Sequence, residues 1–145
     1  MTRTITLAIE SRAECIELLS GALCGLCQLL ALPTAPIEIA LVEAVNNVVE
    51  HAYHGEPGHP VWVEFEWAPD CLNLRVRDCG QPMAPGRLEA MAPLADPDPD
   101  DLATLSLRSR GLSLIKSCMD KVEYEARDGV NTLSMSRALV VSESV

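Results

Sequence analysis

Polar side chains that could do chemistry recur every four residues in the middle of the chain, at Glu43, Asn47 and His51. Residues four apart lie on the same side of an α-helix, so a carboxylate, an amide and an imidazole would form one row. Such a row could converge on a ligand or form a plain solvated helix face, and this segment alone does not distinguish the two. The broad opposite face of the same segment is apolar: Ile37, Leu41, Ala44, Val45, Val48, Val49 and Ala52.

A carboxylate also occupies a position where strand alternation predicts an apolar residue. Asp78 has the same parity as Leu72, Leu74 and Val76, so it points toward the covered face of a sheet. A carboxylate there needs a partner, since leaving it unpaired costs several kcal/mol. Gly80 follows, and its missing side chain would let a ligand or a neighbouring backbone come close. The alternative is that Asp78 only caps the turn that follows the strand.

A third candidate lies where regular structure resumes after a long irregular segment. Gly111 stands at the start of a predicted helix, and free amides at a helix N-terminus bind phosphate groups. Arg108 and Arg110 flank it and bring positive charge to a chain that has little. These residues therefore indicate a possible phosphate site.

The elements that must position these residues follow from hydrophobic periodicity. Ser11 followed by Glu14 predicts a capping box at the start of the first helix, which we expect to be buried on more than one side. The predicted order is strand 4–9, helices 11–32 and 36–54, hairpin 61–78, irregular segment 79–110, helix 111–119 and closing hairpin 122–135. This order predicts an α/β two-layer sandwich in which helices cover one face of a mixed, mostly antiparallel sheet.

Length and composition limit the kind of protein this is. The 145 residues suit a single domain, 1–145, and 48% hydrophobic residues can form a real core. The net charge of −10 disfavours direct nucleic-acid binding and docking to anionic membranes. The most apolar run, residues 18–32, is shorter than the ~20 residues of a membrane span, so we expect a buried helix and no membrane partner. Six cysteines without an export signal indicate reduced thiols and a cytoplasmic location.

Three segments around the candidate residues resemble the motifs of the GHKL ATPases, in the form found in anti-sigma-factor serine/threonine kinases. Residues 43–53 (EAVNNVVEHAY) resemble the N box, residues 78–85 (DCGQPMAP) the adenine-binding box, and residues 109–115 (SRGLSLI) the final glycine box. The three motifs come in the family's order and cover nearly the whole chain. The resemblance implies the Bergerat-type ATP-binding fold, with a lid at about 81–110.

The resemblance implies roles for the N-box residues, with ATP and Mg²⁺ as cofactors. Asn47 would ligate Mg²⁺ through its side-chain oxygen, a hard donor that suits a hard cation. Glu43 would be the general base that takes the proton of the attacking substrate hydroxyl. We expect His51 to contribute to the nucleotide site as a hydrogen-bonding residue that fixes the end of the helix, rather than as a catalyst.

The other two motifs would hold the nucleotide itself. Asp78 would accept a hydrogen bond from the adenine amino group, and Gly80 and Pro82 would let the base approach the backbone. Gly111 and Leu112 would supply amides to the phosphates, and Arg108 or Arg110 would neutralise developing charge. Ser109 replaces the first glycine of its box, which limits positive φ there. Met83 and Ala84 stand where the family often has an aromatic residue and an acid.

Together, these roles imply an ATP-dependent serine/threonine protein kinase. The resemblance implies an anti-sigma factor that binds a sigma factor and phosphorylates an STAS-type anti-anti-sigma protein. One alternative is a catalytically weak nucleotide-binding module that sequesters a partner. Another is a structural dimerisation domain, because Gly21, Ala22 and Gly25 among leucines could form a homodimer face, although core packing explains them equally well.

Redox and zinc chemistry are disfavoured. Cys24 and Cys27 form a C-x-x-C inside a predicted helix, away from a strand-to-helix turn that would lower a thiol pKa. His51, His54, His59 and Cys71 lack the paired spacing of zinc ligands.

Overall fold

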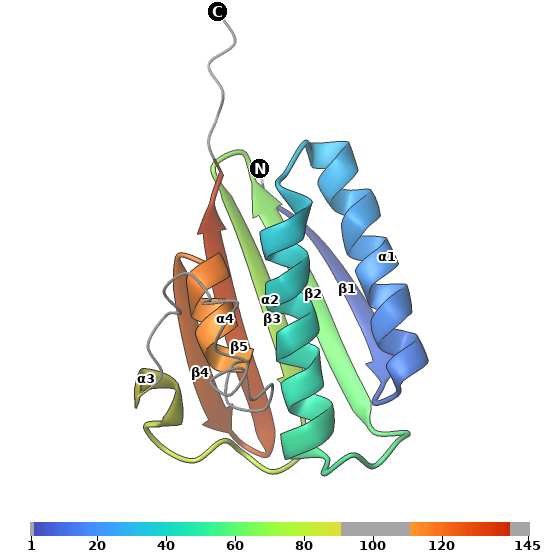
Figure 1. Cartoon of the computed structure of the whole chain (residues 1–145), viewed down its shortest axis with the longest axis vertical. Coiled ribbons are helices and arrows are strands. Elements are labelled where there is room, and N and C mark those ends of the chain that lie inside the picture. Colours follow the sequence, from blue (N-terminus) through green and yellow to red (C-terminus); the bar gives the residue numbers. More distant parts are fainter. Residues whose placement is uncertain (1, 91–110, 140–145) are drawn as a thin grey trace, which may run out of the picture.

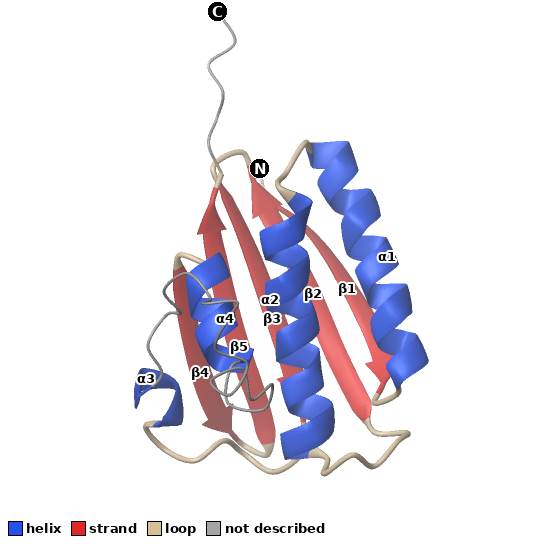
Figure 2. Cartoon of the chain, viewed as in Figure 1, coloured by secondary structure: helices blue, strands red, loops and turns tan. Residues whose placement is uncertain are grey.

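The computed structural model describes residues 2–90 and 111–139. In chain order its elements are β1 (Arg3–Glu10), α1 (Ala13–Leu30), α2 (Thr34–Asn47), η1 (Val48–Ala52), β2 (Pro60–Ala68), β3 (Cys71–Asp78), α3 (Arg87–Ala90), α4 (Gly111–Cys118), β4 (Lys121–Arg127) and β5 (Val130–Ala138). The five strands form one sheet in the order β1-β2-β3-β5-β4, and each pairing among them is antiparallel. Helices α1, α2 and α4 lie on one face of the sheet, which confirms the predicted two-layer sandwich (Figures 1 and 2).

The two faces of the sheet follow the alternation in the sequence. In β3, Leu72, Leu74, Val76 and Asp78 are buried under the helices, while the residues between them are partly exposed. The opposite face is polar, and Arg75 there donates to Glu64 at 2.6 Å and to Glu66 at 3.3 Å. Asp78 thus lies on the covered face, as its parity predicts.

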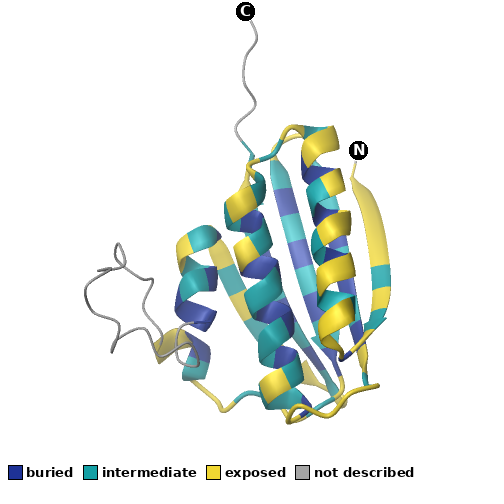
Figure 3. Cartoon of the chain, turned by 45° about the vertical axis from the view of Figure 1, so that its right-hand side comes forward, coloured by how far each residue is buried: buried dark blue, intermediate teal, exposed yellow. Residues whose placement is uncertain are grey.

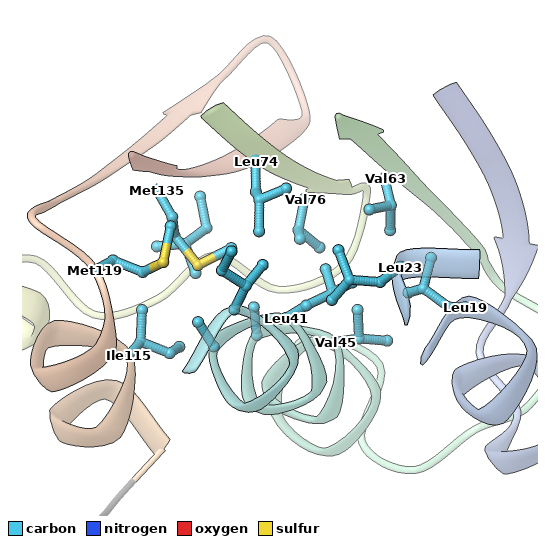
Figure 4. Close-up of a cluster of buried hydrophobic side chains, with 14 of the residues drawn as sticks. Leu19, Leu23, Leu41, Val45, Val63, Leu74, Val76, Ile115, Met119 and Met135 are labelled. Carbon is cyan, nitrogen blue, oxygen red and sulfur yellow. The ribbon is translucent and has the colours of Figure 1, made fainter. Parts of the chain in front are cut away.

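The core lies between α2 and the central strands. Leu41 and Val45 of α2 are fully buried and face Val63, Leu74 and other apolar strand residues (Figure 4). Helices α1 and α4 contact α2 from its two sides, and their side chains Leu19, Leu23 and Ile115 complete the cluster. The central position of α2 fixes its polar row between α4 and the ends of the strands.

The start of α1 differs from the prediction. The helix begins at Ala13 after Arg12, and no side chain caps it. Ser11 is buried instead, where its hydroxyl donates to Glu56 O at 2.8 Å and accepts from the His59 N–H at 3.0 Å. The predicted capping box is therefore wrong, because the Ser11 hydroxyl is used to tie the end of β1 to the loop before β2.

Helix α1 is buried on one face only, which corrects the second expectation for it. Figure 3 shows one side of α1 buried and the other exposed. Leu19, Leu23, Leu26 and Cys27 are buried, whereas Leu18 is 73% exposed and Leu29 is 82% exposed. By length and composition, α1 is the one helix in the described parts of the chain that could cross a membrane. Its buried face packs against α2 and the sheet, which is how a covering helix of a two-layer fold packs.

Part of the segment predicted to be irregular is ordered. Residues 87–90 form the single helical turn α3, whose Leu88 is buried against the core. The remainder of the predicted lid, residues 91–110, lies outside the described residues. All six cysteines are described and unpaired, with Cys24 and Cys27 in the interior of α1.

Candidate functional site

A cavity of about 300 Å³ opens between the helical layer and the ends of the central strands. A space of this size suits a small-molecule ligand. Five of the predicted site residues line it together: Asn47, His51, Asp78, Pro82 and Leu112. Ala44, Val48, Ala52, His54, Val76, Gln81, Met83, Ala84, Arg87, Tyr124 and Leu133, which the sequence did not single out as contacts, complete the lining.

The row on the second predicted helix faces this cavity. Asn47 ends the α-helical part, and η1 continues it as a wider π-helical turn in which the Tyr53 N–H donates to Val48 O at 3.0 Å. Asn47 Nδ2 and His51 Nε2 are buried and have no hydrogen-bond partner in the part of the chain that the structure describes. Buried polar atoms are normally satisfied, so two unpartnered ones on one cavity wall indicate a place for a polar ligand.

His51 does not play the structural part expected of it. Its Nε2 lies unpartnered against the cavity, and no described residue forms a hydrogen bond with its ring. The backbone ends the helix instead, through the Gly55 N–H, which donates to Val49 O at 2.8 Å, and through positive φ at His54 and Gly55. The imidazole is therefore available to a ligand.

Glu43 lies one turn before Asn47, beside the start of α4. A Cβ atom placed on Gly111 would be 3.0 Å from Asn47 Oδ1 and 3.2 Å from Glu43 Oε2, so only glycine fits there without displacement. Burial raises the pKa of Glu43, and the nearby Glu50 carboxylate raises it further. Glu43 does not line the cavity. It lies close to Gly111 at the start of α4, the predicted phosphate-binding position, and one helical turn from Asn47, which does line the cavity.

Asp78 lies at the end of β3, and its burial raises the pKa of its carboxyl. Two donors offset part of that effect: the Gly80 N–H at 2.9 Å and Asn131 Nδ2 at 2.8 Å. Both bonds end on Oδ1, and no described residue donates to Oδ2, so that oxygen is free to accept a hydrogen bond from a ligand. Asn131 is opposite Asp78 in the register of β3 and β5, and sequence reasoning missed it.

Gly80 is required by the protein's own backbone. A Cβ atom there would lie 2.4 Å from Ala52 O, closer than such atoms approach. The neighbouring Gln81 N–H donates to Ala52 O at 2.9 Å, and Asn131 Nδ2 donates to Gly80 O at 3.0 Å. The sequence allowed two explanations for Gly80, the close approach of a ligand or of a neighbouring backbone. The structure supports the second, because the loop lies directly against Ala52.

Sequence reasoning also missed two tyrosines. The Tyr53 hydroxyl accepts from the Cys79 N–H, and the Tyr124 hydroxyl accepts from the Met83 N–H, each at 2.8 Å. Tyr124 alternates with polar residues in step with Val122, so the sequence places its side chain on the apolar face of the strand. A tyrosine hydroxyl on a covered face needs a hydrogen-bond partner, and this requirement could have identified Tyr124.

The remaining predicted residues cannot be placed. Arg108, Ser109 and Arg110 lie outside the described residues. Within residues 2–90 and 111–139, no group of three or more His, Cys, Asp or Glu side chains could hold a metal ion. A divalent cation would therefore need ligands from a bound phosphate and from water besides the Asn47 amide, which is the usual arrangement for Mg²⁺.

The residues present fit a magnesium nucleotide. The cavity wall offers a carboxylate oxygen that can accept from an exocyclic amine, and it also offers an amide and an imidazole with unused polar atoms. Other lining residues, including Val48, Val76 and Leu133, are apolar and suit a flat ring system.

The chain is similar to known proteins over most of its length. The chain is 30% identical over 140 residues to a protein named serine-protein kinase RsbW from Halalkalibacterium halodurans, covering 94% of this chain and 83% of that protein. It is 31% identical over 110 residues to an anti-sigma F factor from Oceanobacillus iheyensis, covering 75% of this chain and 72% of that protein. Another serine-protein kinase RsbW, from Bacillus pumilus, is 32% identical over 147 residues, covering 93% and 85%.

The family comparison extends over almost the whole described fold. Residues 3–137 match the family model described as the histidine kinase-like ATPase domain. That span contains the sheet, the helical layer and the cavity, so the site lies within the matched region. The chain is therefore a member of the histidine kinase-like ATPase family, within which it is similar to the RsbW and anti-sigma F proteins.

Proposed function

We propose that the protein is an ATP-dependent serine/threonine protein kinase that acts as an anti-sigma factor. The observation that carries this proposal is a single cavity lined both by Asp78 and by Asn47 and His51, whose buried Nδ2 and Nε2 atoms have no partner among the described residues. Membership of an ATPase family and similarity to proteins named serine-protein kinase support it.

The residues of the chain divide the work of phosphoryl transfer between them. Asp78 accepts a hydrogen bond from the amine of the base, and Asn47 offers an amide oxygen as a metal ligand. Bound Mg²⁺ would supply charge neutralisation to the phosphates. His51 supplies a further ring nitrogen to the cavity, and Gly111, where a side chain would crowd Asn47, lets the start of α4 lie against Asn47 and Glu43.

Glu43 is the proposed general base. Its raised pKa makes its carboxylate a stronger base than that of an exposed glutamate. It would orient the hydroxyl of a serine or threonine on the substrate protein and take its proton as the hydroxyl attacks the γ-phosphate.

The proposed partners are a sigma factor and an STAS-type anti-anti-sigma protein. The names of the similar proteins, anti-sigma F factor and serine-protein kinase, agree with these two classes of partner. We place this regulator in the cytoplasm, where sigma factors act, and assign it neither direct nucleic-acid binding nor a membrane partner.

The decisive experiment is phosphoryl transfer with purified proteins. Incubation with Mg-ATP labelled at the γ-phosphate and the STAS-domain proteins of the same genome should label one of them on serine or threonine. Glu43→Ala should abolish labelling and still bind ADP, because Glu43 does not line the cavity. Labelling at the wild-type rate by this variant would exclude Glu43 as the base.

An equilibrium titration with ATP separates the kinase from the alternative binding module. The kinase should bind ATP more tightly with Mg²⁺ than with a chelator, and it should turn it over when the partner is present. Tight binding without labelling of any partner would favour the catalytically weak module. Absence of nucleotide binding would favour a purely structural domain.

We also propose that the protein forms a homodimer through the edge of the sheet. Strand β1 pairs only with β2 among the described strands, and its outer edge carries no proline or lysine to discourage pairing. Next to this edge, Leu18 and Leu29 of α1 are exposed on the face that also carries Ala22 and Gly25. A second copy would cover both the strand edge and the exposed leucines.

A further inference from the structure

The loop of residues 79–83 is held at both ends by the only two tyrosines in the chain. Tyr53, which follows η1, accepts a hydrogen bond from the Cys79 N–H at 2.8 Å. Tyr124, on β4, accepts one from the Met83 N–H at 2.8 Å. The loop contributes Met83 to the lining of the cavity, so the tyrosines fix a wall of the site.

The backbone donors inside this loop are also used within the protein. The Gly80 N–H donates to Asp78 Oδ1 at 2.9 Å, and the Gln81 N–H donates to Ala52 O at 2.9 Å. Pro82 has no N–H. No backbone donor of residues 79–83 is left for a ligand, so a hydrogen bond donated to a ring nitrogen of a base at this wall has to come from a side chain.

The two tyrosine hydroxyls differ in what remains of their hydrogen-bonding capacity. The Tyr53 hydroxyl accepts from Cys79 and also donates to Pro60 O at 2.6 Å, so both roles are filled. The Tyr124 hydroxyl accepts from Met83, but its own proton has no acceptor among the described residues. Tyr124 lines the cavity and Tyr53 does not.

Tyr124 also has the correct protonation state to be a donor. Burial raises its pKa above the ordinary value of 10.0, and the nearby Asp78 carboxylate raises it further. The phenol therefore keeps its proton at neutral pH. Asp78, whose Oδ2 has no donor among the described residues, lines the same cavity as Tyr124.

We propose that Tyr124 is a base-contacting residue whose hydroxyl donates a hydrogen bond to a ring nitrogen of the bound nucleotide. This inference rests on the proposed nucleotide site, in which Asp78 accepts from the exocyclic amine of the base. One acceptor and one donor together match adenine, which presents an amine next to ring nitrogens that accept. Guanine presents two acceptors, O6 and N7, on the corresponding edge.

The test is a set of binding measurements on the full chain with ADP and with 1-deaza-, 3-deaza- and 7-deaza-ADP. Each analogue replaces one accepting ring nitrogen with a C–H group. For the wild type, one analogue should bind about fivefold to tenfold more weakly than ADP, as expected for one lost hydrogen bond in a cavity. The Tyr124→Phe variant should bind ADP more weakly than the wild type does, by a similar factor. It should bind the same analogue as tightly as it binds ADP.

Two control variants separate this contact from general effects. Tyr53→Phe removes the hydroxyl that has no free proton, so it should keep the full wild-type difference between ADP and the sensitive analogue. Ser11→Ala removes a buried hydroxyl bonded only to Glu56 and His59, away from the cavity, and should leave every dissociation constant unchanged.

The possible results are distinct. The contact is supported if one analogue binds more weakly than ADP to the wild type and to Tyr53→Phe, but as tightly as ADP to Tyr124→Phe. The contact is overturned if Tyr124→Phe lowers the affinity for ADP and for all three analogues by the same factor. Tyr124 would then only hold the Met83 backbone. Wild-type protein that binds no ADP would overturn the proposed function and this inference together, whereas normal ADP binding with no coupled analogue overturns the inference only.

Discussion

Glu43 combines two properties that favour opposite ionisation states. As a general base it must be ionised, whereas its partial burial and the neighbouring Glu50 raise its pKa and favour the protonated form. The folded protein therefore gives up some stability to keep this carboxylate in place, as functional groups often require.

This conflict gives a pH prediction. The pKa of Glu43 is higher in the folded protein than in the unfolded chain. Its contribution to the free energy of unfolding is therefore fully present below the pKa of the unfolded chain, and it is lost as the pH rises through the pKa of the folded protein. Glu43→Gln should therefore be more stable than the wild type at pH 7, by on the order of 1–3 °C in Tm given solvent screening, and the difference should vanish near pH 4. Thermal unfolding across this pH range measures the difference.

Kinetics provide the second part of the same prediction. Transfer to the protein substrate should fall as the pH drops through the raised pKa of Glu43, and Glu43→Gln should be slower by about 10²–10⁴-fold at pH 7. ADP binding by this variant serves as the control and should stay near the wild-type value. A variant less stable than the wild type at pH 7 would contradict the assigned direction of the pKa shift.

At this scale, sequence reasoning located residues through anomalies in pattern. Asp78 was predicted to face the covered side because it continued the parity of Leu72 to Val76, and the structure confirms that position. Asn131 could not be found, because its contact with Asp78 depends on the register of β5 against β3. The metal-binding role of Asn47 came from the family resemblance, and the phosphate-binding role of Gly111 came from its position at a helix start and from the resemblance. Both roles stay predictions.

At the scale of elements, the end of η1 and the start of the loop after β3 are in direct backbone contact. Ala52 O receives the Gln81 N–H, and Gly80 leaves no room for a side chain against Ala52. The helix that carries Asn47 and His51 is thereby locked to the strand that carries Asp78.

Gly80→Ala should break this contact. Its Cβ would lie 2.4 Å from Ala52 O, so the loop or the helix end must shift, at a cost of about 1–3 kcal/mol in the free energy of unfolding. ADP affinity should fall at least tenfold, because Asp78 and the helix would no longer face a common cavity. Chemical denaturation and a nucleotide titration measure the two effects.

Gly21→Ala is the matched control, because it introduces the same methyl group inside α1 where nothing lies within 4 Å, and Gly21 is outside the row of Leu18, Ala22, Gly25 and Leu29. It should raise the free energy of unfolding by up to about 1 kcal/mol, since alanine is favoured over glycine within a helix. Equal effects of the two substitutions would argue against the contact with Ala52.

The order of elements was predictable because each amphipathic segment carries its own period. The start of α1 was not, because Ser11 is used by a contact 45 residues away, with Glu56. Local patterns cannot show that a capping residue has a competing partner. The exposure of Leu18 and Leu29 was also missed, since composition alone does not tell which apolar face of a helix is covered.

At the scale of the whole molecule, exposed apolar surface is concentrated along α1 and β1. Leu18 and Leu29 are the most exposed large hydrophobic residues among those described, and Ile5 of β1 is 44% exposed. Apolar patches of this kind mark contact surfaces.

The proposed homodimer predicts a specific loss of association. The double substitution Leu18→Glu with Leu29→Glu should convert a dimer to a monomer in sedimentation equilibrium, because it places like charges in the contact. ADP affinity should not change, since α1 does not line the cavity. Gln28→Glu, at the polar margin of the same helix, should remain dimeric. A wild-type protein that sediments as a monomer would exclude this contact.

The wide turn of η1 makes the spacing along the chain inflexible. Deletion of Val49 or Glu50 would narrow this turn to the width of a regular α-helical turn, because a π-helical turn holds about one residue more. His51, which lies within the turn, would then change its direction relative to Asn47 and the cavity. The length of this segment is therefore constrained as strictly as the identity of any residue within it.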